Sequence, residues 1–238
     1  MSRVASSRDS QPDGPTGGSA LSLRGVQRRM GRELVLAGID LEVAPGRLVV
    51  LRGSNGSGKT TLLRLLATRL GPHAGTASVF GHDLVREADA VRRRVGLLSS
   101  SGGSYPVLTA AENLSLAMSL TGKGSQTAAG AALERVGLAD AAAKQVRYFS
   151  SGMKKRLGLA RQLLLDPELW LLDEPHAALD EEGKRLVDEC LTEARSRGRT
   201  VLLASHEQDR EYLAPDAVVE LAGGRLRLVE QAREVMPS

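Results

Sequence analysis

The chain has 238 residues, of which 42% are hydrophobic and 25% charged, a balance typical of a soluble globular protein. Its formal net charge of +4 comes without a long basic block or interleaved aromatic residues, which argues against nucleic-acid binding. The single cysteine, Cys190, excludes an internal disulfide, and no apolar stretch approaches the length that crosses a bilayer. We therefore expect a cytoplasmic protein with one sizeable domain or two small ones.

The first third of the chain predicts a disordered tail followed by strands. Residues 1–20 lack the apolar centre of a signal peptide and mix small, charged and turn-forming residues. Residues 21–26 and 34–43 are strand candidates, and the Ala-Pro-Gly turn at 44–46 follows them. Residues 47–52 form an apolar run typical of a buried parallel strand.

A glycine-rich turn joins this strand to a predicted helix over residues 62–67. A strand, a glycine-rich turn and a helix together are the context of a phosphate-binding loop, whose backbone N–H groups converge on the anion. Lys59 can reach the β- and γ-phosphates of a nucleotide, and the Thr60 hydroxyl can ligate Mg²⁺. A chance turn before a core helix is the alternative, but the complete pattern argues against it. The candidate loop residues are Gly53, Ser54, Asn55, Gly56, Ser57, Gly58, Lys59, Thr60 and Thr61.

The middle of the chain predicts a helical insert. Residues 76–80 and 95–98 indicate strands, with a helix capped by Asp83 and running to residue 94 between them. The Ser/Gly-rich stretch 99–105 predicts a flexible loop. Thr109 and Glu112 have the spacing of a capping box, and residues 128–136 predict a second helix. We expect a helical subdomain over about residues 100–165, inserted into an alternating strand–helix pattern.

The last third predicts two buried strands that end in polar residues. Residues 169–174 form an apolar strand that ends in Asp173 and Glu174, and residues 200–204 form another that precedes Ser205 and His206. Helices are expected at 154–165 and 181–197, then a short helix and two strands around Val218 and Leu226. The repeated rhythm predicts a mostly parallel sheet covered on both faces. The domain would span residues 21–230, with a short tail at 231–238.

The acids at the strand end are the expected partners of the phosphate loop, because ligands bind beyond the carboxyl ends of parallel strands. Asp173 can hold Mg²⁺, and Glu174 can polarise a water for attack on the γ-phosphate. The alternative is that both acids cap the strand or pair with surface lysines. His206 alone would more often be a structural histidine, but its place at the same sheet edge suggests a γ-phosphate contact.

Ser150, Ser151 and Gly152 precede a predicted helix and are a weak signal alone, since many helices begin with such caps. A serine hydroxyl and a helix N-terminus can also bind an anion. This second site would serve a different nucleotide from the one that Lys59 holds.

The order of these motifs resembles that of an ATP-binding cassette (ABC) ATPase over almost the whole ordered chain. The motifs are the phosphate loop, Phe-Ser-Ser-Gly-Met at 149–153, Leu-Leu-Asp-Glu-Pro at 171–175, Ala-Ala-Leu-Asp at 177–180 and Ser-His at 205–206. The resemblance implies an α/β P-loop NTPase fold with a RecA-like core, an antiparallel β-subdomain and an inserted α-helical subdomain. It also implies that ATP and Mg²⁺ bind and that two subunits, most simply a homodimer, sandwich two ATP molecules.

The resemblance assigns roles to the site residues. Glu174 would be the general base, His206 the γ-phosphate sensor, and Ser150 and Gly152 the contacts to ATP held by the other subunit. Asp180 would lie on the loop that communicates between the two sites. The chain departs from the family pattern in three places. Ser100 stands where a glutamine is usual, and Met30 stands near the usual adenine-stacking aromatic. The motif at 149–153 reads Phe-Ser-Ser-Gly-Met where Leu-Ser-Gly-Gly-Gln is usual.

Within the family, the amino-acid sequences of several motifs look most like those of the ATPase subunit of haem exporters used in cytochrome c biogenesis. The implied protein is a motor subunit, peripheral on the inner face of the cell membrane, that powers export through an integral membrane permease. The resemblance implies that this permease docks near residues 99–119. Export of drugs or other small molecules is the alternative. A soluble ABC-type ATPase acting on ribosomes or DNA, or a P-loop kinase, ranks lower, because the chain has one cassette and also carries the serine–glycine motif and His206.

Overall fold

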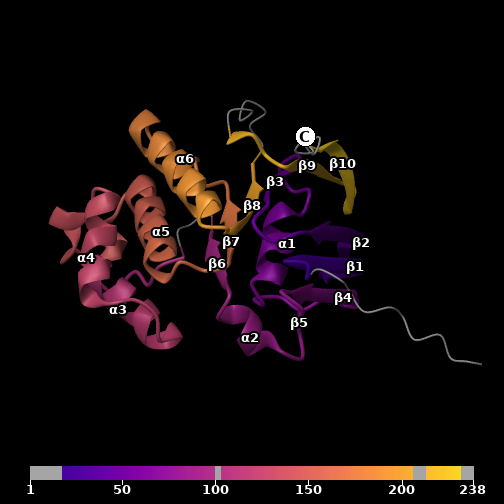
Figure 1. Cartoon of the computed structure of the whole chain (residues 1–238), viewed down its shortest axis with the longest axis horizontal. Coiled ribbons are helices and arrows are strands. Elements are labelled where there is room, and N and C mark those ends of the chain that lie inside the picture. The colour runs from indigo at the N-terminus through magenta and orange to yellow at the C-terminus, as the bar shows by residue number, and fades with distance from the viewer. Residues whose placement is uncertain (1–17, 100–102, 206–212, 232–238) are drawn as a thin grey trace, which may run out of the picture.

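The computed structural model describes residues 18–99, 103–205 and 213–231, which form two sheets and the helices around them (Figure 1). The larger sheet has six strands in the order β10-β9-β3-β8-β7-β6. These strands are β3 (Leu48–Arg52), β6 (Val95–Leu98), β7 (Leu169–Asp173), β8 (Thr200–Ala204), β9 (Ala217–Ala222) and β10 (Arg225–Gln231). All neighbours pair in parallel except β9 and β10. The carboxyl ends of β3, β8 and β7 therefore meet at one edge.

The two faces of this sheet carry separate hydrophobic clusters, as the two-residue period of a strand requires. Along β3, Leu48 and Val50 face one cluster, whereas Val49 and Leu51 face the other. Helix α1 (Lys59–Leu66) packs on the second face with all four of its leucines buried. Because both faces are covered, the parallel strands consist of apolar residues almost throughout, which explains the runs in the sequence.

The smaller sheet is antiparallel and has the order β2-β1-β4-β5. It contributes to the same cluster as α1. Its strands are β1 (Leu21–Met30), β2 (Glu33–Val43), β4 (Ala74–Val79) and β5 (His82–Asp83). The first strand continues past the expected residues 21–26 because it pairs with β2 as a hairpin down to Met30 and Glu33. The predicted α/β architecture, with a mostly parallel core sheet and an antiparallel β-subdomain, is confirmed.

The other face of the large sheet is covered by helices, which lie together on one side of the molecule in Figure 1. The capping box forms as predicted: the Thr109 hydroxyl accepts from Glu112 N at 3.2 Å, and the Glu112 carboxylate accepts from Thr109 N at 2.7 Å. Trp170 and Leu172 of β7 pack against this layer. Its elements are α3 (Ala110–Thr121), α4 (Gln126–Arg135), α5 (Ser151–Leu165), α6 (Glu181–Ser196) and two 3₁₀ turns (Ala139–Ala141 and Val146–Tyr148).

The helix expected between Asp83 and residue 94 is shorter than predicted. Helix α2 covers only Ala88–Arg92, with Glu87 at its N-cap position. Asp83 instead pairs with Ser78 in the small sheet, and its carboxylate accepts from the N–H groups of Val85 and Arg86. Asp83 therefore closes a turn that separates the sheet from the helix.

Several expectations fall outside the described residues: most of the N-terminal tail, Ser100, His206, the short helix after it, and residues 232–238. Among the residues that are described, none lies in a helix long and apolar enough to cross a membrane.

Candidate active site

The phosphate loop connects the carboxyl end of β3 to the first turn of α1. A Cβ on Gly53 would lie 2.6 Å from the carbonyl oxygen of Leu221 and 2.6 Å from the Ser57 hydroxyl. Gly58 has a φ of +108° and lies at the N-cap of α1, against Val35. Side chains at either position would push the loop out of shape, so the glycine spacing is a steric requirement of this turn.

Four side chains named from the sequence converge beside this loop. The Thr60 hydroxyl lies 3.1 and 3.0 Å from the two carboxylate oxygens of Asp173, at the end of β7. Lys59 Nζ donates to the carbonyl oxygen of Gly53 at 2.6 Å and lies 4.0 Å from a carboxylate oxygen of Glu174. The structure thus brings the cation and the hydroxyl of residues 59 and 60 together with the two acids of residues 173 and 174, although the two pairs lie far apart in the chain.

The converging groups line a pocket of about 280 Å³. Glu33 and Val35 of β2 form part of its wall, and the sequence pattern did not identify them. Met30, expected at the adenine, is exposed and pairs with Glu33 at the end of the same hairpin. Met30 is outside the lining, whose loop and strand-end members are Asn55, Gly56, Ser57, Gly58, Lys59, Thr60, Thr61, Asp173 and Glu174.

The donor set fits Mg²⁺ bound together with a nucleotide. Thr60 and Asp173 supply one hydroxyl and one carboxylate, which are the hard oxygen ligands that Mg²⁺ prefers. The described residues contain no group of three or more His, Cys, Asp or Glu side chains that could enclose a metal. Such a sparse site suits Mg²⁺, which keeps several waters and takes its remaining ligands from phosphates.

The residues of the second predicted anion site lie elsewhere. Ser150 is the N-cap of α5, with its hydroxyl accepting from Met153 N at 3.2 Å, and Ser151 begins the helix. Gly152 packs so closely that a Cβ would lie 3.0 Å from the carbonyl oxygen of Ala178. None of the three lines the phosphate pocket of the same chain.

Asp180 joins the serine–glycine motif to the loop after β7. It caps α6 by accepting from Gly183 N at 2.9 Å, and it pairs with Arg156 of α5 at 3.1 Å. The bond from Gly183 N lowers the pKa of this carboxyl, and Arg156 lowers it further. Asp180 is therefore ionised at neutral pH and ties α5 to α6.

Lys155 is a buried residue of this region that the sequence pattern did not single out. Its ammonium donates to the carbonyl oxygen of Asp173 at 3.1 Å and to that of Glu174 at 2.6 Å. Burial lowers the pKa of Lys155 to about 8, although the carboxylates of Asp173 and Glu174 act in the opposite direction. It lies four residues before Leu159 and seven before Gln162 on the buried face of α5, and this helical spacing was the available signal.

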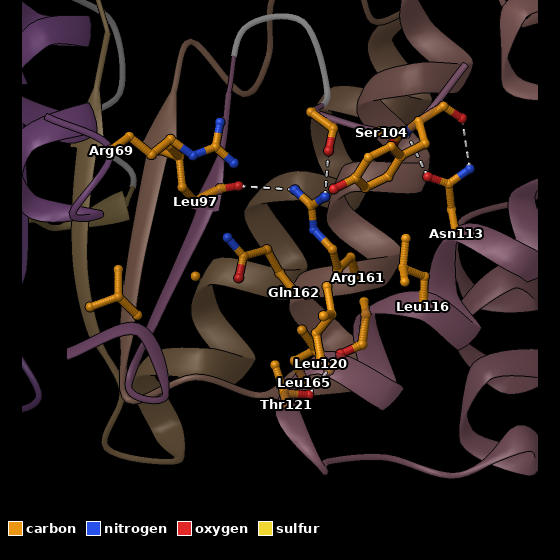
Figure 2. A pocket seen from close by; sticks show the side chains of 15 residues that line it. Arg69, Leu97, Ser104, Asn113, Leu116, Leu120, Thr121, Arg161, Gln162 and Leu165 are labelled. Atoms are coloured by element: carbon orange, nitrogen blue, oxygen red, sulfur yellow. Dashed lines mark hydrogen bonds between the residues drawn. The ribbon is translucent and has the colours of Figure 1, made fainter. Parts of the chain in front are cut away.

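A second cavity, of about 550 Å³, lies between β6 and the helices α3 and α5 (Figure 2). Arg161 crosses its floor and donates to the carbonyl oxygens of Gly103 at 2.6 Å and Leu97 at 3.1 Å. Leu116, Leu120 and Leu165 supply an apolar wall. Leu120 is 73% exposed, so an apolar rim opens to solvent.

Residues 36–177 match the family model described as ABC transporter. The chain is also 40% identical over 211 residues to "Daunorubicin resistance ATP-binding protein DrrA3" of Streptomyces coeruleorubidus, covering 87% of this chain and 67% of that protein. The chain belongs to the ABC transporter family. It is an ABC ATPase, and the sequence-based assignment to this family of ATP-hydrolysing proteins is correct.

Other ABC relatives differ in their named roles. A "Nod factor export ATP-binding protein I" of Ralstonia nicotianae is 34% identical, covering 92% of this chain and 70% of that protein. A "Phosphate import ATP-binding protein PstB 2" of Natronomonas pharaonis is also 34% identical, covering 87% and 78%. The chain thus spans about two thirds to three quarters of the length of these relatives.

The fold of this ABC ATPase is similar to that of a solved dimeric ATP-binding cassette in a post-hydrolysis state bound to ADP and Pi. The two share 25% sequence identity with a TM-score of 0.81, over 90% of this chain and 99% of the solved one.

Proposed function

We propose that this ABC ATPase is the motor subunit of an exporter of drugs or other small organic molecules and acts with a separate membrane permease. The observation that supports this most is the match over 87% of the chain to a protein named for daunorubicin resistance. The motif sequences suggested haem export, but none of the relatives described above is named for it. Small-molecule export is therefore the better-supported proposal, and a relative named for import makes the direction of transport the point to test.

Hydrolysis would follow from the geometry of the phosphate pocket. The loop N–H groups and Lys59 bind the β- and γ-phosphates, while Thr60 and Asp173 would hold Mg²⁺, which neutralises charge on the phosphates when bound. Glu174 takes a proton from water as the water oxygen attacks the γ-phosphorus. The bond to the leaving oxygen breaks and gives ADP and inorganic phosphate. His206, which follows β8 in the sequence, is proposed as a γ-phosphate contact.

The separation of Ser150 and Gly152 from the phosphate pocket supports a two-subunit site. Their anion-binding ends would close over ATP held by the partner copy, most simply in a homodimer, with Asp180 beside them at the shared boundary. A solved cassette of the same fold was dimeric with ADP and Pi bound. ATP binding would then close the dimer, and hydrolysis with product release would reopen it.

The cavity of Figure 2 is the proposed docking place of the permease at the inner face of the membrane. Its exposed rim residue Leu120 belongs to α3, close to the region 99–119 that the family resemblance assigns to such a contact. An apolar permease segment would pack against the wall formed by Leu116, Leu120 and Leu165 and would exclude water from it.

The experiment is affinity purification of tagged Glu174→Gln protein with ATP from gently solubilised membranes, followed by mass spectrometry. We expect a multi-span membrane protein, and we expect Leu120→Glu to abolish its recovery while the ATPase rate of the isolated chain stays the same. Val229→Glu on β10, also at an exposed position, is the matched control and should leave recovery unchanged.

Efflux of a fluorescent anthracycline from cells carrying the chain and its partner then tests cargo and direction. Accumulation of the dye instead of efflux would contradict export. Recovery of ribosomes alone would support the soluble alternative, and a phosphorylated small molecule in place of free phosphate would support a kinase.

A further inference from the structure

We propose that Lys155 is a positioning residue that holds Glu174 in its hydrolytic orientation, so that the serine–glycine helix α5 controls the general base of its own subunit. This inference rests on the proposed role of Glu174 as the base.

The contact is direct and buried. Lys155 is 3% exposed, and its ammonium donates to two consecutive carbonyl oxygens, those of Asp173 at 3.1 Å and Glu174 at 2.6 Å. A charged donor so completely removed from water is costly to bury unless it is hydrogen-bonded, and such charge-assisted bonds are the strong ones. The two peptide groups at the end of β7 are therefore fixed to α5.

The second carbonyl belongs to a residue with an unusual backbone. Glu174 has a φ of +50°, in the left-handed region that side chains other than glycine rarely adopt. Such a conformation is strained and persists only where surrounding contacts enforce it. Its N–H donates to the carbonyl oxygen of Ala204 at 3.0 Å, and its carbonyl oxygen accepts from Lys155 and, at 3.2 Å, from Ala177 N. Lys155 supplies the shortest of these three restraints.

This geometry aims the Glu174 side chain at the phosphate pocket. One carboxylate oxygen lies 4.0 Å from Lys59 Nζ, within the wall that the phosphate loop shares with Asp173. If the peptide rotated toward an ordinary conformation, the Cα–Cβ bond would turn with it and carry the carboxylate away. Misplacement of a reacting group by about 1 Å can cost about 100-fold in rate.

The same lysine lies in the second turn of α5, whose first turn carries Ser150 and Gly152. A shift of α5 relative to the sheet would therefore stretch the bonds to Glu174. A movement of the helix that contacts the partner's nucleotide would thus change the orientation of the general base in its own subunit.

Lys155→Met removes both hydrogen bonds while keeping an unbranched apolar side chain that ends one atom short of the lysine ammonium. We expect its kcat for ATP to fall about 100-fold with KM changed by less than about 3-fold, because the lysine does not line the phosphate pocket. Lys154→Met loses the same charge one residue away, at a partly exposed position, and should keep the wild-type rate. Lys155→Arg, which restores a cationic donor, should recover at least about 10-fold of the loss.

A double mutant separates positioning from folding. If the lysine acts on the rate through the Glu174 carboxylate, the residual single-turnover rate of Glu174→Gln should be unchanged when Lys155→Met is added. An effect through the Asp173 backbone and the proposed Mg²⁺ site would lower that rate further. Binding of a fluorescent ATP analogue, measured in parallel, counts the folded sites in each variant.

Three results would overturn the proposal. They are a wild-type kcat for Lys155→Met, a further loss of the full factor in the double mutant, and a parallel loss of nucleotide-binding sites in Lys155→Met and Lys155→Arg. A wild-type rate for Glu174→Gln would overturn the general-base role as well. If Glu174→Gln loses its activity as expected but Lys155→Met keeps the wild-type kcat, only the positioning role is overturned.

Discussion

Replacing Glu174 by glutamine should separate ATP binding from ATP hydrolysis. The two side chains have nearly the same shape, so the restraints on the residue-174 backbone from Ala204 and Lys155 should persist. The substitution takes away the proton-accepting carboxylate. General-base catalysis contributes about 100- to 10,000-fold, which corresponds to about 3–5 kcal/mol of the barrier.

The hydrolysis rate should fall, whereas the affinity for ATP should rise or stay unchanged. Glutamine removes the ionic attraction between residue 174 and Lys59, whose charged groups lie 4.0 Å apart in the native chain. Removing a negative charge beside a triphosphate reduces repulsion, so ATP binding should be unchanged or tighter. The expected signature is therefore a kcat effect without a rise in KM.

The assay is phosphate release at saturating MgATP, together with size-exclusion chromatography in ATP. We expect Glu174→Gln to lose at least about 100-fold in rate and to accumulate as an ATP-bound dimer. Glu181→Gln, an exposed acid at the start of α6, is the control and should behave as wild type. A rate within about 3-fold of wild type would refute the assignment of the base. A variant that stays monomeric in ATP at high protein concentration would refute the two-subunit site.

Three further outcomes follow from other contacts. Thr60→Val keeps the side-chain shape but removes the hydroxyl, so Mg²⁺-dependent ATPase activity should fall at least about 10-fold. Thr60→Ser keeps a hydroxyl and should retain the activity. Equal activity of the two variants in a Mg²⁺ titration would contradict this assignment. Burial raises the pKa of Asp216, but bonds from Leu48 N and Arg47 and the charge of Arg195 outweigh it and lower the pKa overall. Asp216→Asn should therefore cost about 2 kcal/mol of unfolding free energy at pH 7. Because the lowered pKa stabilises the fold above the ordinary carboxyl pKa, this difference should shrink as pH falls below about 4, and urea unfolding at both pH values checks it. Burial raises the pKa of Cys190 to about 12, so a thiol reagent at pH 8 should label it only after denaturation, and rapid labelling of the native protein would show that the site opens.

The sequence was sufficient for the part of the site built from strand ends. Parallel strands must be apolar along their length and meet at one edge, so polar residues that follow β3 and β7 had to converge. This is why the contact between Thr60 and Asp173 could be predicted although the two residues lie far apart in the chain. The glycine spacing of the loop was informative for the same kind of reason, since Gly53 has no room for a Cβ.

The parts that could not be predicted depend on packing between elements. Glu33 and Val35 reach the phosphate pocket from the other sheet, and no local pattern specifies how one sheet sits on another. Lys155 carries a charge on the buried face of α5, where a pattern of apolar periodicity gives no reason to expect a bond to a strand end. The length of β1 was underestimated because pairing with β2, and not its own composition, sets where it ends.

The left-handed backbone at Glu174 also sets up a conflict between stability and activity. Glycine at this position would adopt the φ of +50° without strain, so Glu174→Gly should gain about 1 kcal/mol in that conformation, before the greater freedom of its unfolded chain is counted. Asparagine, which tolerates this region better than most residues, would be the next choice. A laboratory selection for thermal stability alone would thus favour replacements at the residue on which hydrolysis is proposed to depend. The glutamate is expected to survive only where turnover is selected at the same time.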